Sequence, residues 1–110
     1  MKTETTVQLD VWQTLAVLPV GRQLDGWRIE QRNTLPDTSP WRTNHEMVVS
    51  SEDRFLIRTF WRAVFWDSPA GVSAPVNADG VVVLREVVPR DRGSEVVFLD
   101  EELVDELHDV

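Results

Sequence analysis

Residues 50–66 of the chain, SSEDRFLIRTFWRAVFW, decide the fold class, because this stretch fits both a helix and a pair of strands. Ser50 followed by Glu52 and Asp53 resembles a helix N-cap with acids in the first turn. Apolar side chains then recur at the i, i+3, i+4, i+7 spacing of one helix face, at Ile57, Phe60, Trp61 and Val64. We therefore predict a helix over residues 51–66. The alternative is two buried strands, because Phe, Ile, Val and Trp also favour sheets.

The segment that follows predicts a pair of strands. Residues 81–88, VVVLREVV, form the clearest strand pattern in the chain, and the turn sequence NADG at residues 77–80 leads into them. Residues 89–94 are a polar turn. Residues 95–99, EVVFL, are short and apolar enough to pair antiparallel with 81–88.

The segment that precedes residue 50 predicts further strands. Residues 5–11 alternate polar with apolar side chains and indicate a half-buried strand, while 12–20 is an edge strand or a short helix that ends at Pro19. Asp25-Gly26 is a hairpin turn signal leading into an alternating run at 27–32. Residues 33–44 contain two prolines among polar residues, which predicts a long irregular loop.

The last residues predict an acidic amphipathic helix over about 99–109, with Asp100 as its N-cap. Its apolar stripe consists of Leu99, Leu103, Val104 and Leu107. The predicted fold class is therefore α+β. It has an antiparallel sheet of about four to six strands, a central covering helix at about 51–66 and the C-terminal helix, in a single domain spanning 1–110.

Composition excludes several classes of function. The chain has 110 residues, no cysteine and a formal net charge of -8. Disulfides, thiolate nucleophiles and cysteine-ligated metal centres are ruled out, and direct binding to nucleic acid or to anionic membranes is disfavoured. No apolar run is long enough to span a membrane and the first residues lack a signal-peptide pattern, so we expect a cytoplasmic protein.

The acids of the predicted C-terminal helix are the first candidate binding site. Its partner-binding residues are Glu101, Glu102, Asp105, Glu106 and Asp109. With Asp100 they give a charge about every 2.7 Å along a helix, compared with ~1.7 Å for duplex DNA and ~3.4 Å for one strand. This density suggests a nucleic-acid mimic that occupies the basic groove of a partner. A solvated helix face is the simpler alternative.

An arginine row at positions 54, 58 and 62 has the same four-residue repeat as the acids at 101, 105 and 109. If both segments are helices, the two rows can pair within the molecule. If the rows do not meet, the arginines become a candidate site for an anionic partner.

The tryptophans Trp41, Trp61 and Trp66 complete the candidate partner-binding residues. Trp41 either anchors its loop to the core or contacts a partner. Trp61 and Trp66, with Phe60 and Phe65, either pack in the core or form the interface of a homodimer or of a heteromeric complex.

The sequence offers no convincing catalytic, metal or cofactor site. Residues 75–86 approach an EF-hand pattern, but Pro75 stands where the first ligand is required, so an Asx turn is the better interpretation. His45 and His108 belong to no catalytic motif. We therefore expect no catalytic residues, no bound metal and no cofactor.

These observations favour a non-enzymatic protein-interaction module. The leading hypothesis is an inhibitor or accessory factor of a nucleic-acid-handling protein, of the kind that mobile elements encode, which engages a basic partner surface through its acidic face. The alternative is a structural or assembly subunit that binds or dimerises through an aromatic surface, its acidity serving solubility or salt adaptation.

Overall fold

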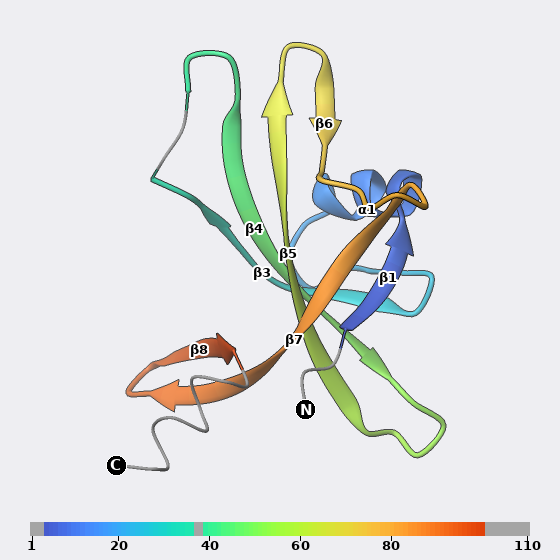
Figure 1. The fold of residues 1–110 in the computed structure, drawn as a ribbon. Coiled ribbons are helices and arrows are strands. Elements are labelled where there is room, and N and C mark those ends of the chain that lie inside the picture. The colour runs from blue at the N-terminus through green and yellow to red at the C-terminus, as the bar shows by residue number, and fades with distance from the viewer. Residues whose placement is uncertain (1–3, 37–38, 101–110) are drawn as a thin grey trace.

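A strongly curled antiparallel sheet and one short helix form the part of the chain that the computed structural model describes, residues 4–36 and 39–100 (Figure 1). Strands make up 62% of these residues and helix 8%, so the predicted α+β class is wrong and the fold is a mostly-β half-barrel. In chain order the elements are β1 (Glu4–Gln8), α1 (Leu9–Ala16), β2 (Gln23–Leu24), β3 (Trp27–Thr34), β4 (Thr43–Glu52), β5 (Arg58–Ser68), β6 (Gly71–Ser73), β7 (Val81–Arg92) and β8 (Glu95–Asp100).

The central helix predicted over 51–66 is wrong, because this stretch forms the end of β4, a turn and most of β5. The two strands pair without a break from Thr43↔Asp67 to Glu52↔Arg58. Trp61 and Phe65 are buried on one face of β5, and Phe60 packs on the other. A strand covered on both faces carries apolar residues at successive positions. In β5 some of these positions match the i, i+3, i+4, i+7 spacing of a helix face, which explains the wrong prediction.

The predicted C-terminal helix is also wrong where the structure can be described. Leu99 and Asp100, its expected first residues, belong to β8 and pair with Val88 and Val87. The remainder of that prediction, residues 101–109, lies outside the described residues.

Strand β7 organises the sheet because it contacts three other strands. It pairs with β1 over residues 81–85, with β5 over 85–87 and with β8 over 87–92. Arg85 faces both β1 and β5, and Val87 faces both β5 and β8, so β1 and β8 share the edge of β7 opposite β5. The contact with β5 is short and the two strands cross steeply, which curls the sheet (Figure 1).

The main core lies on the face of the sheet that α1 covers, here called the helix-side face. Trp12 and Leu15 of α1 are fully buried against side chains of the sheet. The sheet contributes, among others, Ile29, Met47, Val49, Trp61, Phe65, Val82 and Leu84. Of the two alternatives for residues 12–20, an edge strand or a short helix, the helix forms. It begins at Leu9, within the strand expected at 5–11, and ends at Ala16, before Pro19.

A second, smaller core lies on the opposite face, here called the hairpin-side face because the β7–β8 hairpin folds over it. Val48, Val87 and Phe98 are buried there, with Phe60 packed against them. Pro89 lies beyond the last β5–β7 pair, so its missing N–H removes no bond from that ladder. The predicted pairing of 95–99 is confirmed, but its partner is the second half of β7 and not residues 81–88 as a whole.

Turn chemistry accounts for the local predictions that hold. Asp25 and Gly26 both have positive φ (51° and 82°), which is the backbone of a type I′ turn, and they join β2 to β3 as the sequence predicts. The Asn77 side chain accepts hydrogen bonds from the Asp79 and Val81 amides (2.9 and 3.3 Å), which confirms the Asx turn that leads into β7.

A helix that could cross a membrane would have to be long and apolar, and none occurs in the described part of the chain.

Two tryptophans provide a direct test of the packing. Trp12→Ala should lower the free energy of unfolding by about 3–5 kcal/mol, because it removes a fully buried aromatic side chain from the main core. Trp41→Ala is the matched control; its indole is 78% exposed and its loss should change stability by less than about 0.5 kcal/mol. Urea unfolding of both variants measures the difference, and equal destabilisation would contradict the described core.

Candidate functional site

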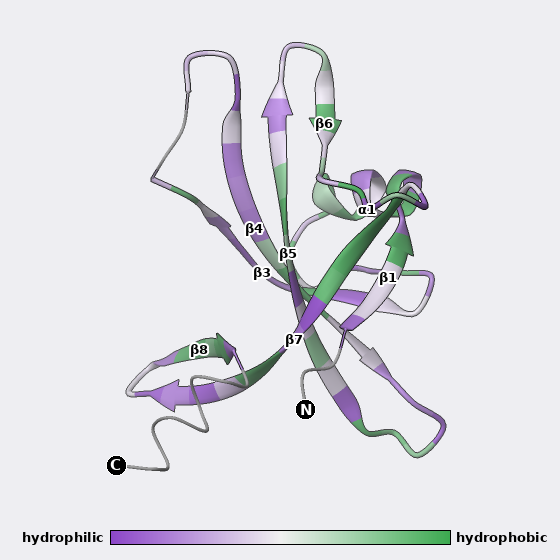
Figure 2. Ribbon diagram, in the orientation of Figure 1, coloured by the Kyte–Doolittle hydropathy of each residue, from purple (hydrophilic) through white to green (hydrophobic). Residues whose placement is uncertain are grey.

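The turn between β4 and β5, residues 53–57 (DRFLI), is the candidate functional site and is here called the apolar turn. Phe55, Leu56 and Ile57 are 67%, 76% and 61% exposed. Within residues 4–36 and 39–100 no other three consecutive large apolar residues are all exposed. The turn lies at the far end of the β4–β5 hairpin, away from α1, and Figure 2 shows its hydrophobic colour at that tip. An exposed apolar cluster on a soluble surface marks an interaction site more often than a scattered single residue does.

Asp53 holds the apolar turn in one conformation. Its Oδ1 accepts hydrogen bonds from the backbone N–H groups of Phe55 (2.8 Å) and Ile57 (3.0 Å). Its carbonyl accepts from the Leu56 N–H (3.0 Å), and its own N–H donates to the Ile57 carbonyl (3.1 Å). Four hydrogen bonds to one residue therefore fix the backbone that carries the three apolar side chains.

Leu56 has a φ of 62°, in the left-handed region that β-carbon sterics disfavour for leucine. Glycine, asparagine or aspartate is the usual residue there, as at Asp25 and Gly26 in this chain. A bulky apolar residue kept in a strained and exposed position contributes neither to the core nor to turn stability. Such strain is typical of positions retained for binding.

Charged side chains at the base of the hairpin connect the apolar turn to the sheet. Arg58 forms an ion pair with Glu52 (2.6 Å), and its Nη1 donates to the buried Ser50 hydroxyl (2.7 Å). Ser50 donates in turn to Glu30 (3.2 Å), which also accepts from Arg28 (2.6 Å). A β-bulge in β3 between Ile29 and Gln31 leaves Glu30 outside the pairing register, and both Glu30 and Gln31 line the hairpin-side face. The network orients the strand ends that support the turn.

The predicted arginine row separates in the structure. Arg54 lies in the apolar turn with its guanidinium 4.8 Å from the Phe55 ring centroid. Arg58 and Arg62 lie on one face of β5; Arg62 is 3.8 Å from both Glu46 and Asp100, and it donates to the Phe98 carbonyl. Arg58 and Arg62 are thus neutralised by acids of the sheet. The candidate acids Glu101, Glu102, Asp105, Glu106 and Asp109 lie outside the described residues.

The three candidate tryptophans have three different environments. Trp61 is buried in the main core and donates from Nε1 to the Ser51 hydroxyl (3.3 Å). Trp66 is partly buried, with the Arg42 guanidinium 4.7 Å from its ring centroid. Trp41 extends into solvent from the β3–β4 connection, so it does not anchor that loop to the core. Trp41 and Trp66 keep exposed aromatic surface, whereas the Trp61 indole is part of the core.

A hydroxyl, an imidazole and a carboxylate form a chain across β3, β4 and β5. Thr34 Oγ1 lies 3.2 Å from His45 Nδ1, and His45 Nε2 lies 3.2 Å from Asp67 Oδ2. The His45 ring stacks on Phe65, with centroids 4.8 Å apart. The sequence places His45 in no catalytic motif and does not indicate Thr34 or Asp67 as its partners, because only strand register brings these residues together.

A hydrolytic triad also requires donors aimed at the oxyanion. The nearby Leu35 amide is not available, because it donates to the Asn44 carbonyl (2.8 Å). Polar groups on neighbouring strands commonly hydrogen-bond to one another and stabilise the sheet. The contacts among Thr34, His45 and Asp67 are of this kind. No cluster of three or more metal-ligating side chains occurs among the described residues either.

Comparison of the chain with protein-family models, with curated proteins and with solved structures found no match.

The strain at Leu56 predicts an unusual effect on stability. Leu56→Asn should raise the free energy of unfolding by about 1 kcal/mol, because asparagine tolerates positive φ and the leucine side chain buries little surface. Ile57→Asn is the matched control; Ile57 is similarly exposed but does not have positive φ, so no gain is expected there. Thermal unfolding compares the two variants, and stabilisation of both or of neither would contradict the strain.

Proposed function

We propose that this chain is a non-enzymatic protein-interaction module that binds a partner protein by inserting Phe55, Leu56 and Ile57 into an apolar pocket. The strained and exposed Leu56 is the single observation that carries the proposal. The cytoplasmic location expected from the sequence is part of the proposal. This proposal modifies the hypothesis of an aromatic binding surface. The proposed binding residues are those of the apolar turn instead of Trp61.

The size and rigidity of the turn are suited to this role. Full burial of one Phe, Leu or Ile side chain contributes about 1.5–3 kcal/mol, so three largely exposed side chains supply several kcal/mol of binding free energy. Because the Asp53 hydrogen bonds already fix the backbone, little conformational entropy is lost on binding. A compact anchor of this kind acts as an interface hot spot.

Charge favours a protein over a membrane as the occupant. Within residues 52–58 the acids Glu52 and Asp53 balance Arg54 and Arg58, so the turn carries no excess positive charge that would attract anionic lipid. The chain as a whole has a net charge of -8 and is repelled by such surfaces. A fixed turn conformation adds shape specificity, which a fluid bilayer does not require but a protein pocket does.

The mimicry hypothesis from the sequence remains a separate proposal. It places the binding surface at Glu101, Glu102, Asp105, Glu106 and Asp109 and predicts a basic partner groove. Charge reversal of Glu101, Asp105 and Asp109 to Lys abolishes partner binding under that hypothesis, and changes to the apolar turn do not.

Site-specific photo-crosslinking tests the apolar turn in the native host. A photoreactive phenylalanine at position 55 should crosslink to one partner protein, while the same residue at the exposed Val17 should not. With that partner purified, Leu56→Asn should weaken its binding at least about tenfold, because an apolar anchor is lost. The same variant should be more stable than the native chain, so weaker binding cannot be attributed to unfolding.

The other outcomes of this experiment are decisive as well. Crosslinks to lipid would replace the protein partner with a membrane, and crosslinks between copies of the chain would make the turn a dimer contact. Equal crosslinking from positions 55 and 17, or unchanged affinity of Leu56→Asn, would overturn the proposal.

A further inference from the structure

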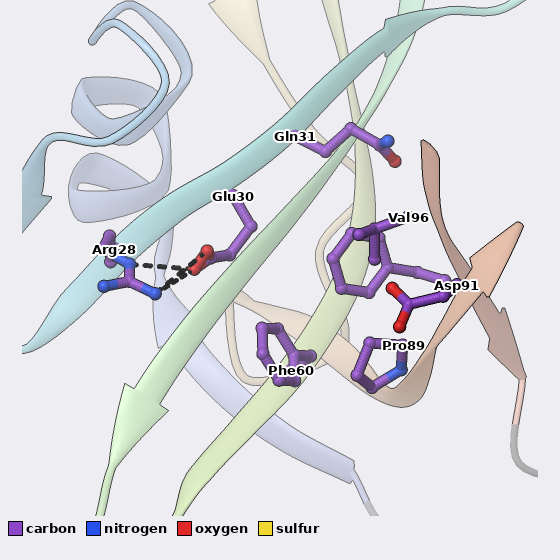
Figure 3. A pocket seen from close by; sticks show the side chains of 8 residues that line it. Arg28, Glu30, Gln31, Phe60, Pro89, Asp91 and Val96 are labelled. Atoms are coloured by element: carbon purple, nitrogen blue, oxygen red, sulfur yellow. Dashed lines mark hydrogen bonds and ion pairs between the residues drawn. The ribbon is translucent and has the colours of Figure 1, made fainter. Parts of the chain in front are cut away.

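A second candidate site lies on the hairpin-side face, where the β7–β8 hairpin leaves an open cavity of 570 Å³ over β3 and β5 (Figure 3). This volume is in the range of small-ligand sites. Its apolar part consists of Phe60, Phe98, Pro89 and Val96, with the two rings 5.3 Å apart and tilted by 42°. The cavity is separate from the apolar turn and shares no residue with it.

The two carboxylates that line the cavity differ in their partners. On the β3 side Glu30 accepts three hydrogen bonds from Arg28 (2.8, 2.6 and 3.2 Å) and one from Ser50 (3.2 Å), so both charges of that pair are satisfied. On the opposite side the Asp91 carboxylate is turned toward Pro89 and Phe60 (Figure 3). None of the side chains in residues 4–36 and 39–100 forms an ion pair or hydrogen bond with it. One exposed carboxylate without a partner in the described part of the chain therefore lies beside two aromatic rings.

We propose that this cavity binds a guanidinium group carried on an aliphatic stem. The planar cation would form a bidentate pair with Asp91 and lie against Phe60 and Phe98, and the stem would contact Pro89 and Val96. Guanidinium fits better than ammonium because it is planar, stacks on aromatic faces and is more weakly hydrated. The net charge of -8 adds a long-range attraction for cations.

An anionic ligand is the opposite possibility, since Arg28 also lines the cavity. Three features disfavour it. Arg28 is held by Glu30, the lining carries two carboxylates and one guanidinium, and the overall charge of the chain repels anions. An anion would have to break the Arg28–Glu30 pair, whereas a cation uses a carboxylate that has no partner among residues 4–36 and 39–100.

NMR titration of the full chain with butylguanidinium tests the proposal. Resonances of Gln31, Val96 and Phe98 should shift and saturate, and the affinity should fall with added salt. Butylurea, a neutral analogue of similar shape, should not bind, and pentanoate tests the anionic alternative. Agmatine and a blocked Gly-Arg-Gly peptide, titrated in parallel, distinguish a free small molecule from the arginine side chain of a partner.

Two variants assign the binding to Asp91. Asp91→Asn should weaken butylguanidinium binding roughly tenfold, through loss of a charge-assisted pair. Glu95→Gln removes the same charge from the same hairpin, but Glu95 does not line the cavity, so affinity should be unchanged. Equal binding of butylurea, tighter binding of pentanoate, or an equal loss in both variants would overturn the proposal. Leu56→Asn should leave the titration unchanged, so this test is independent of the apolar turn.

Discussion

The β4–β5 hairpin is covered on both faces, and the rest of the structure depends on this constraint. On the helix-side face Met47, Val49, Trp61 and Phe65 are buried in the main core beneath α1. On the hairpin-side face Val48 and Phe60 pack against Phe98 and Val87. A flat two-layer arrangement can cover only one side of a strand pair. The chain covers both by crossing β7 over β5 and folding the far half of β7 back with β8.

This arrangement explains why the apolar turn is exposed. The strands β4 and β5 are long, and their pairing continues to Glu52↔Arg58, beyond the β5–β7 contact at residues 60–62. The hairpin therefore extends past the elements that cover its middle. Its end is stabilised locally, by Asp53 in the turn and by the Glu52–Arg58 pair at its base. The three apolar side chains at the tip are therefore left largely exposed, and the proposed partner binding would account for them.

Three arginines of the sheet are paired with acids on its hairpin-side face. Arg28, Arg58 and Arg62 each lie beside acids on the hairpin-side face, and the buried Ser50 joins two of these pairs. A network of this kind specifies strand register, because a shift by one residue would move its members to the opposite face. Asp91 stands apart as a carboxylate at an aromatic cavity. The apolar turn and this cavity thus have different chemistries and lie on different elements.

Turn chemistry and local alternation determined a substantial part of the fold from the sequence alone. Asp25-Gly26 favours positive φ and a hairpin turn, Asn77 favours an Asx turn, and the valine-rich run at 81–88 favours a strand. The sequence also determined the absence of cysteine chemistry and the acidic character of the chain. These properties depend on single residues or on close neighbours, so no tertiary information is needed to predict them.

Only the tertiary structure decided that residues 50–66 are strands, because burial on both faces produces the same apolar spacing as one helix face. It also decided which residues form the candidate sites. The sequence favoured Trp61, which the fold buries, and overlooked Phe55, Leu56, Ile57 and Asp91. Exposure and long-range pairing depend on where a strand crosses its neighbours. That crossing is a property of the whole sheet, and no local pattern specifies it.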